Sequence, residues 1–411
     1  MERMPVSDPS AAKTPLNATE RRAAAGLAGV FGLRMFGLFL ILPVFALYAP
    51  ALEGATPLLI GLALGIYGLT QAVLQIPMGM VSDRWGRKPV IAAGLVVFAV
   101  GSVVAATADG IWGVIIGRAL QGGGAIAAAV MALAADVTRE THRGRAFAVI
   151  GMSVGLAFLL ALMVAPPLTA LGGLQGLFWL TAGASLVGLV IVARMPRPAR
   201  PAQSAVSGSL RRSFTDPDLM RLNVGIFVLH AALTGIFVAL PLLIQARFGL
   251  EAAQHWRVWV PLLITSVAGM LPLLILAERR RIMHRLIPAA ATAMALGLMG
   301  LGLLAEAPVA FWLFALWLYF VSFNLLEAAM PSLVSRFAPG EARGAAMGVY
   351  ASAQFLGAFA GGLIGGALAG GFGAAGVMLG CAIMVSLWAL LARGQRAPVP
   401  VGDPQASEGS G

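Results

Sequence analysis

Charged residues are scarce in this sequence. Of its 411 residues, 11% are Asp, Glu, Lys or Arg, whereas 59% are hydrophobic. A water-soluble fold of this size and composition would expose large apolar patches. The scarcity of charge therefore excludes an ordinary soluble protein and indicates a chain that folds in lipid.

Cysteine and lysine are also nearly missing. Cys381 is the single cysteine, so a disulfide within the chain and a cysteine metal site are excluded, and its apolar surroundings predict a core position. The two lysines, Lys13 and Lys88, do not follow glycine, so there is no Walker loop and ATP is not expected as the fuel. Without clustered metal ligands or a nucleophile motif in the apolar runs, we expect no cofactor, no metal and no enzyme.

Apolar runs of about 20 residues fill most of the chain, each long enough to cross roughly 30 Å of hydrocarbon. Arg34 interrupts the first run, which predicts a retained helix rather than a cleaved signal. The predicted fold class is an all-α membrane protein with twelve transmembrane helices. The expected spans are 24–48, 57–81, 89–107, 111–135, 145–170, 176–193, 220–246, 256–277, 285–305, 309–334, 343–370 and 373–392.

The net charge of +11 comes from basic residues that alternate with the spans. With the N-terminus in the cytoplasm, all but four of the 28 lysines and arginines fall at or beyond the cytoplasmic ends of spans. The exceptions are Arg247 and Arg257 in outer loops and Arg34 and Arg118 inside spans. This bias predicts a multi-pass protein of the cell inner membrane with both termini cytoplasmic, in contact with lipids and not with nucleic acid.

An interval rich in Pro, Ser and Arg divides the chain into two similar halves. The sequence Arg143-Gly144-Arg145-Ala146-Phe147 of the first half is echoed by Arg343-Gly344-Ala345-Ala346-Met347 in the second. Parallel six-helix repeats of this kind enclose a solute site near mid-membrane in known transporters. The predicted segments are a cytoplasmic tail at 1–22, a six-helix bundle at 23–194, a cytoplasmic linker at 195–218, a second six-helix bundle at 219–393 and a disordered tail at 394–411.

The loop after the second span contains a dense motif of Gly79, Asp83, Arg84, Gly86, Arg87 and Lys88. It resembles the signature loop of the major facilitator superfamily at every defining position. The resemblance implies two six-helix bundles in the major facilitator fold and a transporter of a small-molecule substrate that works as a monomer. It also implies that Asp136 meets Arg87 in a cytoplasmic latch, whereas helix capping is the alternative role for Asp136.

Two further motifs bear on the mechanism. Arg118-Ala119-Leu120-Gln121-Gly122-Gly123-Gly124 resembles the second motif of the superfamily, which implies a role for Arg118 in proton coupling or in holding the charge of the central cavity. The fifth span has Ala165-Pro166 where antiporters of the superfamily have Gly-Pro. Because of this difference, the motif gives weaker support for an antiporter.

Local matches resemble one branch of the superfamily, the YajR-like proton-driven drug exporters. They include Leu33-Arg34-Met35, Gly65 to Val73, His255-Trp256 and Phe323 to Ala328. The branch carries a soluble domain after its last helix, and here we expect only a tail after Arg393. The resemblance implies a proton-coupled antiporter that exports amphipathic, drug-like molecules. The alternatives are a carrier of one metabolite, such as a sugar or an amino acid, and more remotely a receptor or enzyme on the same fold.

Four ionisable residues lie inside the predicted spans: Arg34, Arg118, His230 and Glu327. We expect them to couple protons or to line the central cavity. Burial favours the neutral form of Glu327, which suits a carboxyl that gains and loses a proton, although a structural pairing is the alternative. His230 fits either a proton step or a helix-to-helix hydrogen bond. Arg34 is expected either to pair with Glu327 or to clamp an anionic substrate.

Small residues recur at four-residue spacing in the eleventh span, at Gly357, Gly361, Gly365 and Ala369. Such a stripe lets two helices approach closely. Static packing is one reading of the stripe. In a transporter whose halves rock, we expect it to be a sliding contact with Gly61 and Gly65 of the second span.

Overall fold

The computed structural model describes residues 17–195, 215–304, 306–338 and 343–397, which fold into helices with no named strand in those ranges. Parts of the predicted tails and linker, namely residues 1–16, 196–214 and 398–411, lie outside the described residues. The helices of the first half are α1 (Ala18–Phe39), α2 (Phe45–Tyr48), α3 (Pro57–Trp85), α4 (Arg87–Ala106), α5 (Ile111–Gly123), α6 (Ala127–Val137) and α7 (Arg143–Arg194).

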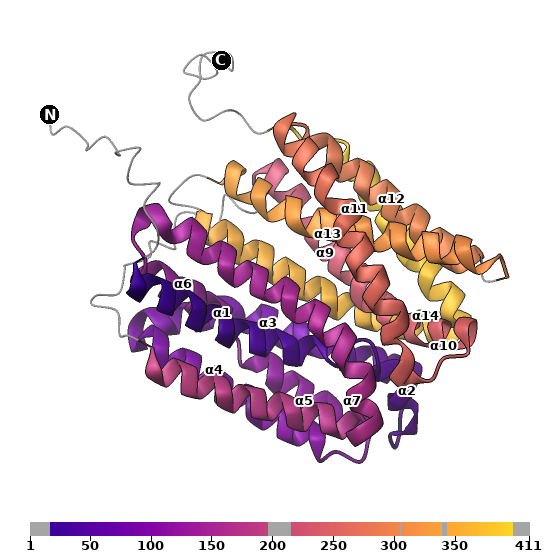
Figure 1. Cartoon of the computed structure of the whole chain (residues 1–411), viewed down its shortest axis with the longest axis horizontal. Coiled ribbons are helices and arrows are strands. Elements are labelled where there is room, and N and C mark those ends of the chain that lie inside the picture. The colour runs from indigo at the N-terminus through magenta and orange to yellow at the C-terminus, as the bar shows by residue number, and fades with distance from the viewer. Residues whose placement is uncertain (1–16, 196–214, 305, 339–342, 398–411) are drawn as a thin grey trace, which may run out of the picture.

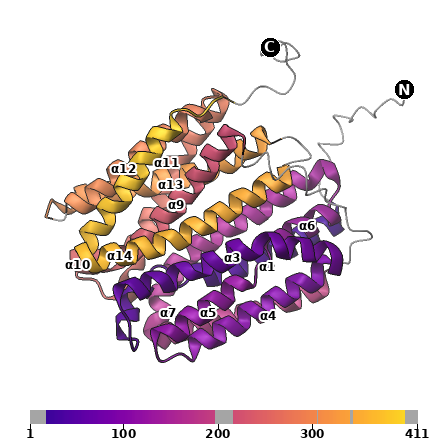
Figure 2. The same ribbon diagram turned by 180° about the vertical axis from the view of Figure 1, so that it is seen from behind.

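The helices of the second half are α9 (Pro217–Phe237), α10 (Leu240–Phe248), α11 (Trp256–Arg279), α12 (Met283–Leu303), α13 (Val309–Phe337) and α14 (Arg343–Ala392). Figures 1 and 2 show the two sets side by side, with the helices of the first half in indigo to magenta and those of the second in orange to yellow. The predicted all-α membrane fold is confirmed.

Ten of the helical segments in the described ranges are long and apolar enough to cross a membrane. Two of them contain a sharp kink at a glycine with positive φ, Gly173 in α7 (φ 61°) and Gly373 in α14 (φ 65°). Only glycine adopts that conformation without steric cost, so each of these segments is two helices joined at the kink. The count of twelve spans stays a prediction and treats α7 and α14 as two spans each.

Two predicted spans are broken by proline. The expected helix 24–48 ends at Phe39, and the expected helix 220–246 is interrupted after Phe237. Pro43 and Pro241 each stand four residues further on, where the proline ring clashes with the carbonyl group of residue i−4 and donates no hydrogen bond. The same Phe-x-x-Leu-Pro pattern therefore ends α1 and α9 at matching places in the two halves. The continuous helices predicted there were wrong.

The fourth predicted span, 111–135, is also divided. α5 ends at Gly123 and α6 begins at Ala127. A side chain at Gly124 would collide with the backbone of Gly94 in α4, so α4 and this bend are in close contact. The bend follows the run of three glycines from Gly122, each of which weakens a helix.

The two halves touch mainly at one end of the molecule. The contacts join α3 to α14, α7 to α11, and α2 to α10. We call the end formed by α2 and α10 the far end. The opposite end, where α4 begins at Arg87, α7 ends at Arg194 and α11 ends at Arg279, is here called the basic end.

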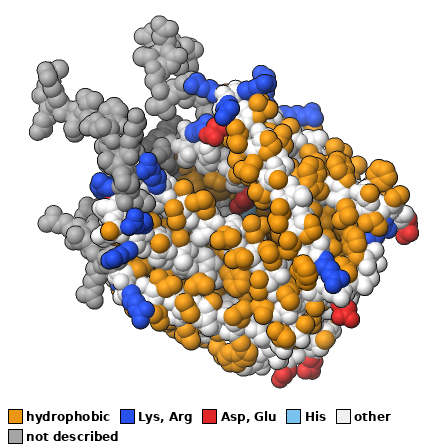
Figure 3. All heavy atoms as spheres, viewed as in Figure 1, with side chains coloured by type: hydrophobic (Ala, Val, Ile, Leu, Met, Phe, Trp, Pro, Cys, Tyr) orange, Lys and Arg blue, Asp and Glu red, His pale blue; other side chains and the backbone are white. Residues whose placement is uncertain are grey.

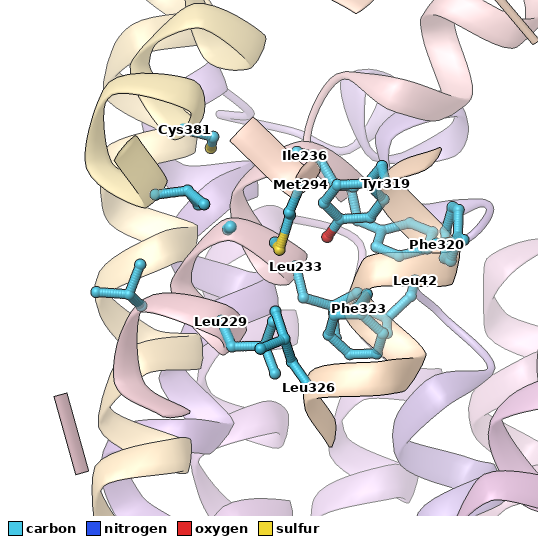
Figure 4. Close-up of a cluster of buried hydrophobic side chains, with 14 of the residues drawn as sticks. Leu42, Leu229, Leu233, Ile236, Met294, Tyr319, Phe320, Phe323, Leu326 and Cys381 are labelled. Atoms are coloured by element: carbon cyan, nitrogen blue, oxygen red, sulfur yellow. The ribbon is translucent and has the colours of Figure 1, made fainter. Parts of the chain in front are cut away.

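A shared apolar core supports the contact at the far end. Leu42, from the break after α1, packs among Leu233, Phe320 and Phe323 of the second half, as the close-up in Figure 4 shows. Cys381 lies in the same cluster and is buried, as its apolar surroundings predicted. The proline break thus places first-half residues inside the core of the second half.

The contact between α3 and α14 relies on glycine, although the residues differ from those expected. A Cβ atom on Gly61 would overlap the carbonyl oxygen of Gly362, and one on Gly65 would crowd the backbone of Phe359. Gly357, Gly361 and Gly365 instead face Phe227, Ala231 and Gly235 of α9 within the second half. The predicted partner helix was correct, but the predicted stripe was wrong by one residue along α14.

Large apolar side chains cover the outer surface of the helices, as orange spheres show in Figure 3. Trp112 and Trp256 are exposed at the starts of α5 and α11 near the far end, and Trp85 is exposed at the basic end. Tryptophan is enriched where membrane meets water. These positions fit a molecule whose helices cross the hydrocarbon core of a membrane with their ends at its two surfaces.

Candidate functional site

A polar set in the second half joins three helices. The Nε2 atom of Gln354 in α14 donates a hydrogen bond to Nε2 of His230 in α9, at 2.8 Å. The same amide donates to Oε1 of Glu327 in α13, at 3.3 Å. Nε2 of His230 lies 3.8 Å from Oε2 of Glu327. One glutamine therefore holds together two of the residues that the sequence proposed for proton coupling.

This set lies where the molecule is hollow. The Glu327 side chain is 38% exposed and that of His230 is 14% exposed, although both are in the middle of long helices. Figure 3 shows the surface hollowed between the two halves. Near the basic end of α14, Gly344 and Gly348 face open space with nothing within 4 Å. The contacts at the far end and this open space together describe a cleft that opens toward the basic end.

Aromatic rings border the same region. The ring of Phe323 lies 6.1 Å from the ring of His230 and 6.5 Å from that of Phe158 in α7. Phe158 also makes an edge contact with Phe39 at the end of α1, at 5.1 Å. Beside the Glu327 set, the two halves thus meet through apolar and aromatic groups, which suit organic molecules.

The first half holds a different polar set, centred on Arg34. Its Nη2 atom donates to Oε1 of Gln71 at 2.5 Å, and Nε2 of Gln71 donates to Oε1 of Gln75 at 2.6 Å. Arg34 is only 1% exposed, and its guanidinium lies 5.3 Å from the ring centroid of Phe98. The cation is therefore sealed among α1, α3 and α4.

Arg118 lies in the same interior, and each of its three guanidinium nitrogens donates a hydrogen bond. Its side chain donates to the backbone oxygens of Ala63 and Leu64, at 3.3 and 3.4 Å, and to Oε1 of Gln121, at 2.8 Å. Gln121 in turn donates to Ser102 at 2.8 Å. Backbone carbonyl and amide groups here offset the charge, as expected for an arginine within a membrane span.

One tyrosine separates the two arginines. The ring centroid of Tyr67 lies 5.5 Å from Cζ of Arg34 and 5.1 Å from Cζ of Arg118. Both distances are within the range of cation–π attraction. None of the ion pairs found among the described residues includes either arginine.

The structure resolves one alternative that the sequence left open. Arg34 is not paired with Glu327, since its side chain bonds to Gln71 while Glu327 contacts Gln354 and His230. The uncharged partners Gln71, Gln75 and Gln354, together with Tyr67, were not among the four residues that the sequence predicted for this site. Glutamine inside an apolar run is the signal that could have found three of them.

The signature loop forms a cluster at the basic end, which we call the latch cluster: Asp83, Arg87 and Asp136. Arg87, only 4% exposed, makes an ion pair with Asp83 and lies 3.3 Å from Oδ2 of Asp136. It also donates to the hydroxyl of Ser82 at 2.8 Å. The structure thus brings Arg87 to Asp136, joining the starts and ends of α3, α4 and α6 within the first half.

The other motif residues have structural positions of their own. Gly86, with φ of 95°, is the turn between α3 and α4, and Gly79 packs against Ala128 of α6. Lys88 donates to the backbone oxygens of Ala193 and Met195 at the end of α7, at 3.3 and 2.6 Å. Arg84 is exposed and is absent from the ion pairs found among the described residues.

Metal ligands do not converge in the part of the chain that the structure describes. No group of three or more His, Cys, Asp or Glu side chains there could hold a metal ion. The set around Glu327 contains a carboxyl and an imidazole that can bind or release a proton, whereas the set around Arg34 can hold an anion or a polar group by hydrogen bonds.

Comparison with known proteins places these features in a family. The family model described as Major Facilitator Superfamily matches residues 27–327. The inner membrane transport protein YajR of Escherichia coli (strain K12) is 45% identical over 391 residues, which cover 92% of this chain and 84% of that protein. The multidrug resistance protein MdtH of Yersinia pestis (strain Pestoides F) is 26% identical over 324 residues, 77% of this chain and 79% of its own length.

A solved structure has the same architecture. The crystal structure of a D-xylose-proton symporter aligns with a TM-score of 0.73 over 93% of this chain and 98% of its own. The sequence identity is 17%, so this likeness shows the fold alone.

Proposed function

Because the chain belongs to the major facilitator superfamily, we propose that this transporter is a proton-coupled antiporter that exports amphipathic small molecules by alternating access. The chain is a multi-pass membrane transporter and not an enzyme, since its relatives and structural neighbours are transporters of this family. The proposal adds the coupling ion, the direction and the kind of substrate. The proposal also places the protein in the cell inner membrane as a monomer, with both of its termini in the cytoplasm.

The observation that carries the proposal is the set formed by Glu327, Gln354 and His230. A carboxyl beside an imidazole, within a cleft between two halves, is a place where a proton can be taken up and released during a cycle. The three residues come from α9, α13 and α14, and all three helices make contacts with the first half. A change in protonation can therefore alter how the halves fit together.

Alternating access needs a contact that closes each end in turn. In the described conformation the far end is closed by α3 on α14, and the cleft opens at the basic end. In the opposite conformation the latch cluster is proposed to meet the basic end of α14, while the glycine contact at Gly61 and Gly362 separates. Helices that touch through glycine backbone carry few side chains that must repack during such a movement.

The proton gradient is an adequate source of energy. One proton gains about 2.3 kcal/mol per 100 mV and about 1.4 kcal/mol per pH unit. Together these terms support a solute gradient of a few hundredfold. The names of relatives point the same way, since one is a multidrug resistance protein.

Purified protein in proteoliposomes tests the proposal. An inward-directed proton gradient should drive at least one amphipathic probe outward, with the cation ethidium and the anion 2-naphthoate both tested. A gradient of that probe should in turn move protons, which a pH-sensitive dye inside the vesicles reports. D-xylose and a set of amino acids serve as the arm for a metabolite carrier. Proton movement with one of those metabolites, and with no amphipathic probe, would show that the exporter proposal is wrong.

A further inference from the structure

The two buried arginines of the first half differ in how well their donors are satisfied. All three nitrogens of the Arg118 guanidinium donate hydrogen bonds. In Arg34 only Nη2 does so, and Nε and Nη1 are buried without a hydrogen-bond partner among the described residues. A buried cation with unmet donors is costly, so Arg34 is a group whose chemistry calls for an acceptor.

The surroundings of Arg34 call for a negative charge in particular. Its side-chain neighbours Gln71, Tyr67 and Phe98 are neutral, and the second guanidinium, of Arg118, faces the same Tyr67 ring. The hydroxyl of Tyr67 is also buried without a partner in the described chain. The three N–H groups on Nε and Nη1 of Arg34 and the phenol O–H are thus available, and a carboxylate is an acceptor that suits all of them.

A path to this cluster runs along the contact between the halves. Tyr67 stands between Arg34 and α14, where its ring lies 6.2 Å from the ring of Phe355. Next to it, a Cβ on Gly68 would overlap the carbonyl oxygen of Phe355, so α3 and α14 are closely packed here. In the described conformation this contact covers the cluster. Separation of α3 from α14 would uncover Tyr67 first and the guanidinium behind it next.

We infer that Arg34, together with Tyr67, binds the anionic head group of the transported molecule when α3 and α14 separate. The substrate class is then amphipathic organic anions, above all aromatic or aliphatic carboxylates. The inference rests on the proposed function as an exporter and specifies its substrate. Arg118 supplies a second positive charge near the Tyr67 ring and is held in place by hydrogen bonds from all three of its guanidinium nitrogens.

A matched ligand pair provides the test. 2-Naphthoate and 2-naphthamide have nearly the same shape, and only the first is charged at neutral pH. Quenching of tryptophan fluorescence in the purified full-length chain gives both dissociation constants. Because charge-assisted hydrogen bonds are the strong ones, we expect naphthoate to bind at least about tenfold more tightly than naphthamide.

Three variants locate the effect. Arg34→Gln should bring the affinity ratio of the two ligands close to one by weakening naphthoate alone, whereas Arg34→Lys should retain part of the preference. Arg22→Gln, which changes an exposed arginine at the start of the same helix, should leave the ratio unchanged. Removing an unpaired buried charge should also keep or raise the melting temperature of Arg34→Gln, so loss of folding does not imitate loss of binding.

Several results would overturn the inference. Equal affinities of the wild type for naphthoate and naphthamide, or a preference for naphthoate that persists in Arg34→Gln, would show that Arg34 does not bind the anionic group. Replacing gluconate by chloride tests whether the site binds an inorganic anion instead. If chloride raises the melting temperature of the wild type but not of Arg34→Gln, while the two naphthyl ligands bind alike, the site holds a free ion and not the substrate. Proton-driven export of naphthamide but not naphthoate would refute this inference and leave the proposed exporter standing. If none of the probes produces proton movement, the proposed function itself is refuted.

Discussion

The two halves have helix breaks at matching places but differ in the polar groups that they contain. In both, a Phe-x-x-Leu-Pro sequence ends the first long helix, and a glycine with positive φ folds the last segment back at Gly173 or Gly373. The interior of the first half holds two permanently charged arginines that are 1% exposed. The second half instead presents Glu327 and His230, which titrate and are partly accessible from the cleft.

The basic ends differ in the same sense. In the first half Arg87 is buried between Asp83 and Asp136. In the second half the comparable ends of α11 and α13 are joined by Glu278 and Arg336, which are 62% and 40% exposed. At this end the first half therefore holds Arg87 in a buried cluster, whereas the Glu278–Arg336 pair of the second half is exposed. This difference suits a rigid half working against a responsive one.

The largest expected effect is on Glu327. Changing Glu327 to Gln keeps the shape and the hydrogen bonds available to Gln354 but removes the proton site, so export driven by a pH gradient should fall to the level of empty vesicles. The matched control is Glu251→Gln, an exposed acid at the far end. Flux of an amphipathic probe in proteoliposomes is the measurement. Driven flux that survives in Glu327→Gln would place the proton site elsewhere and remove the functional contrast between the halves.

A second prediction concerns the contact that joins the halves. Gly61→Val would insert a side chain against the backbone of Gly362, so we expect the far end to remain open while each half folds. Because Cys381 is the single native cysteine and is buried, a cysteine introduced at buried Ile60 can be labelled selectively. Its reaction with a membrane-impermeant maleimide should be several-fold faster in Gly61→Val. Gly176→Val, with nothing within 4 Å of the added carbon, is the control, and equal rates in both variants would refute the contact's role as a closure.

The third prediction tests the buried latch cluster. Asp136→Asn leaves Arg87 buried with Asp83 as its remaining acid, and the loss of one charged partner should cost about 2–3 kcal/mol of stability. The melting temperature of the purified protein should fall by several degrees. A melting temperature that stays at the wild-type value would mean that this half gains no rigidity from its buried ion pair.

The smallest effect is expected at the matching pair of the second half. Glu278→Gln removes an exposed partner of Arg336, and exposed ion pairs contribute about 0–1 kcal/mol. The melting temperature should change little, and added salt should narrow any difference. A fall as large as that of Asp136→Asn would erase the distinction between a rigid and a responsive half.

Patterns that act through the backbone or the membrane could be predicted from the sequence. The apolar runs and the signature loop follow from residue type and spacing, and the approach of Arg87 to Asp136 was implied by the family that this loop resembles. The breaks after Phe39 and Phe237 could also have been foreseen, because Pro43 and Pro241 stand in the sequence. They were missed because a hydropathy window averages over a single proline.

Other features depended on how helices rotate against each other. The small residues of α14 form two adjacent stripes, and a shift of one residue, about 100° around the helix, decides which stripe faces α9 and which faces α3. The pairing of Arg34 with Glu327 was likewise left open, and its actual partner Gln71 was not foreseen, because both residues lie on other helices. Sequence spacing fixes the neighbours along one helix but not those across two.

The sequence by itself determined that this chain lives in a membrane, that it consists of two related halves, and that it has a loop typical of the major facilitator superfamily. Those conclusions rest on transfer free energy and on local motifs, which need no knowledge of packing. Only the tertiary structure decided that the arginines are sealed around Tyr67, that Gln354 joins His230 to Glu327, and that the halves meet at the far end. These outcomes depend on contacts between distant segments, and burial and helix rotation set such contacts only when the whole chain is folded.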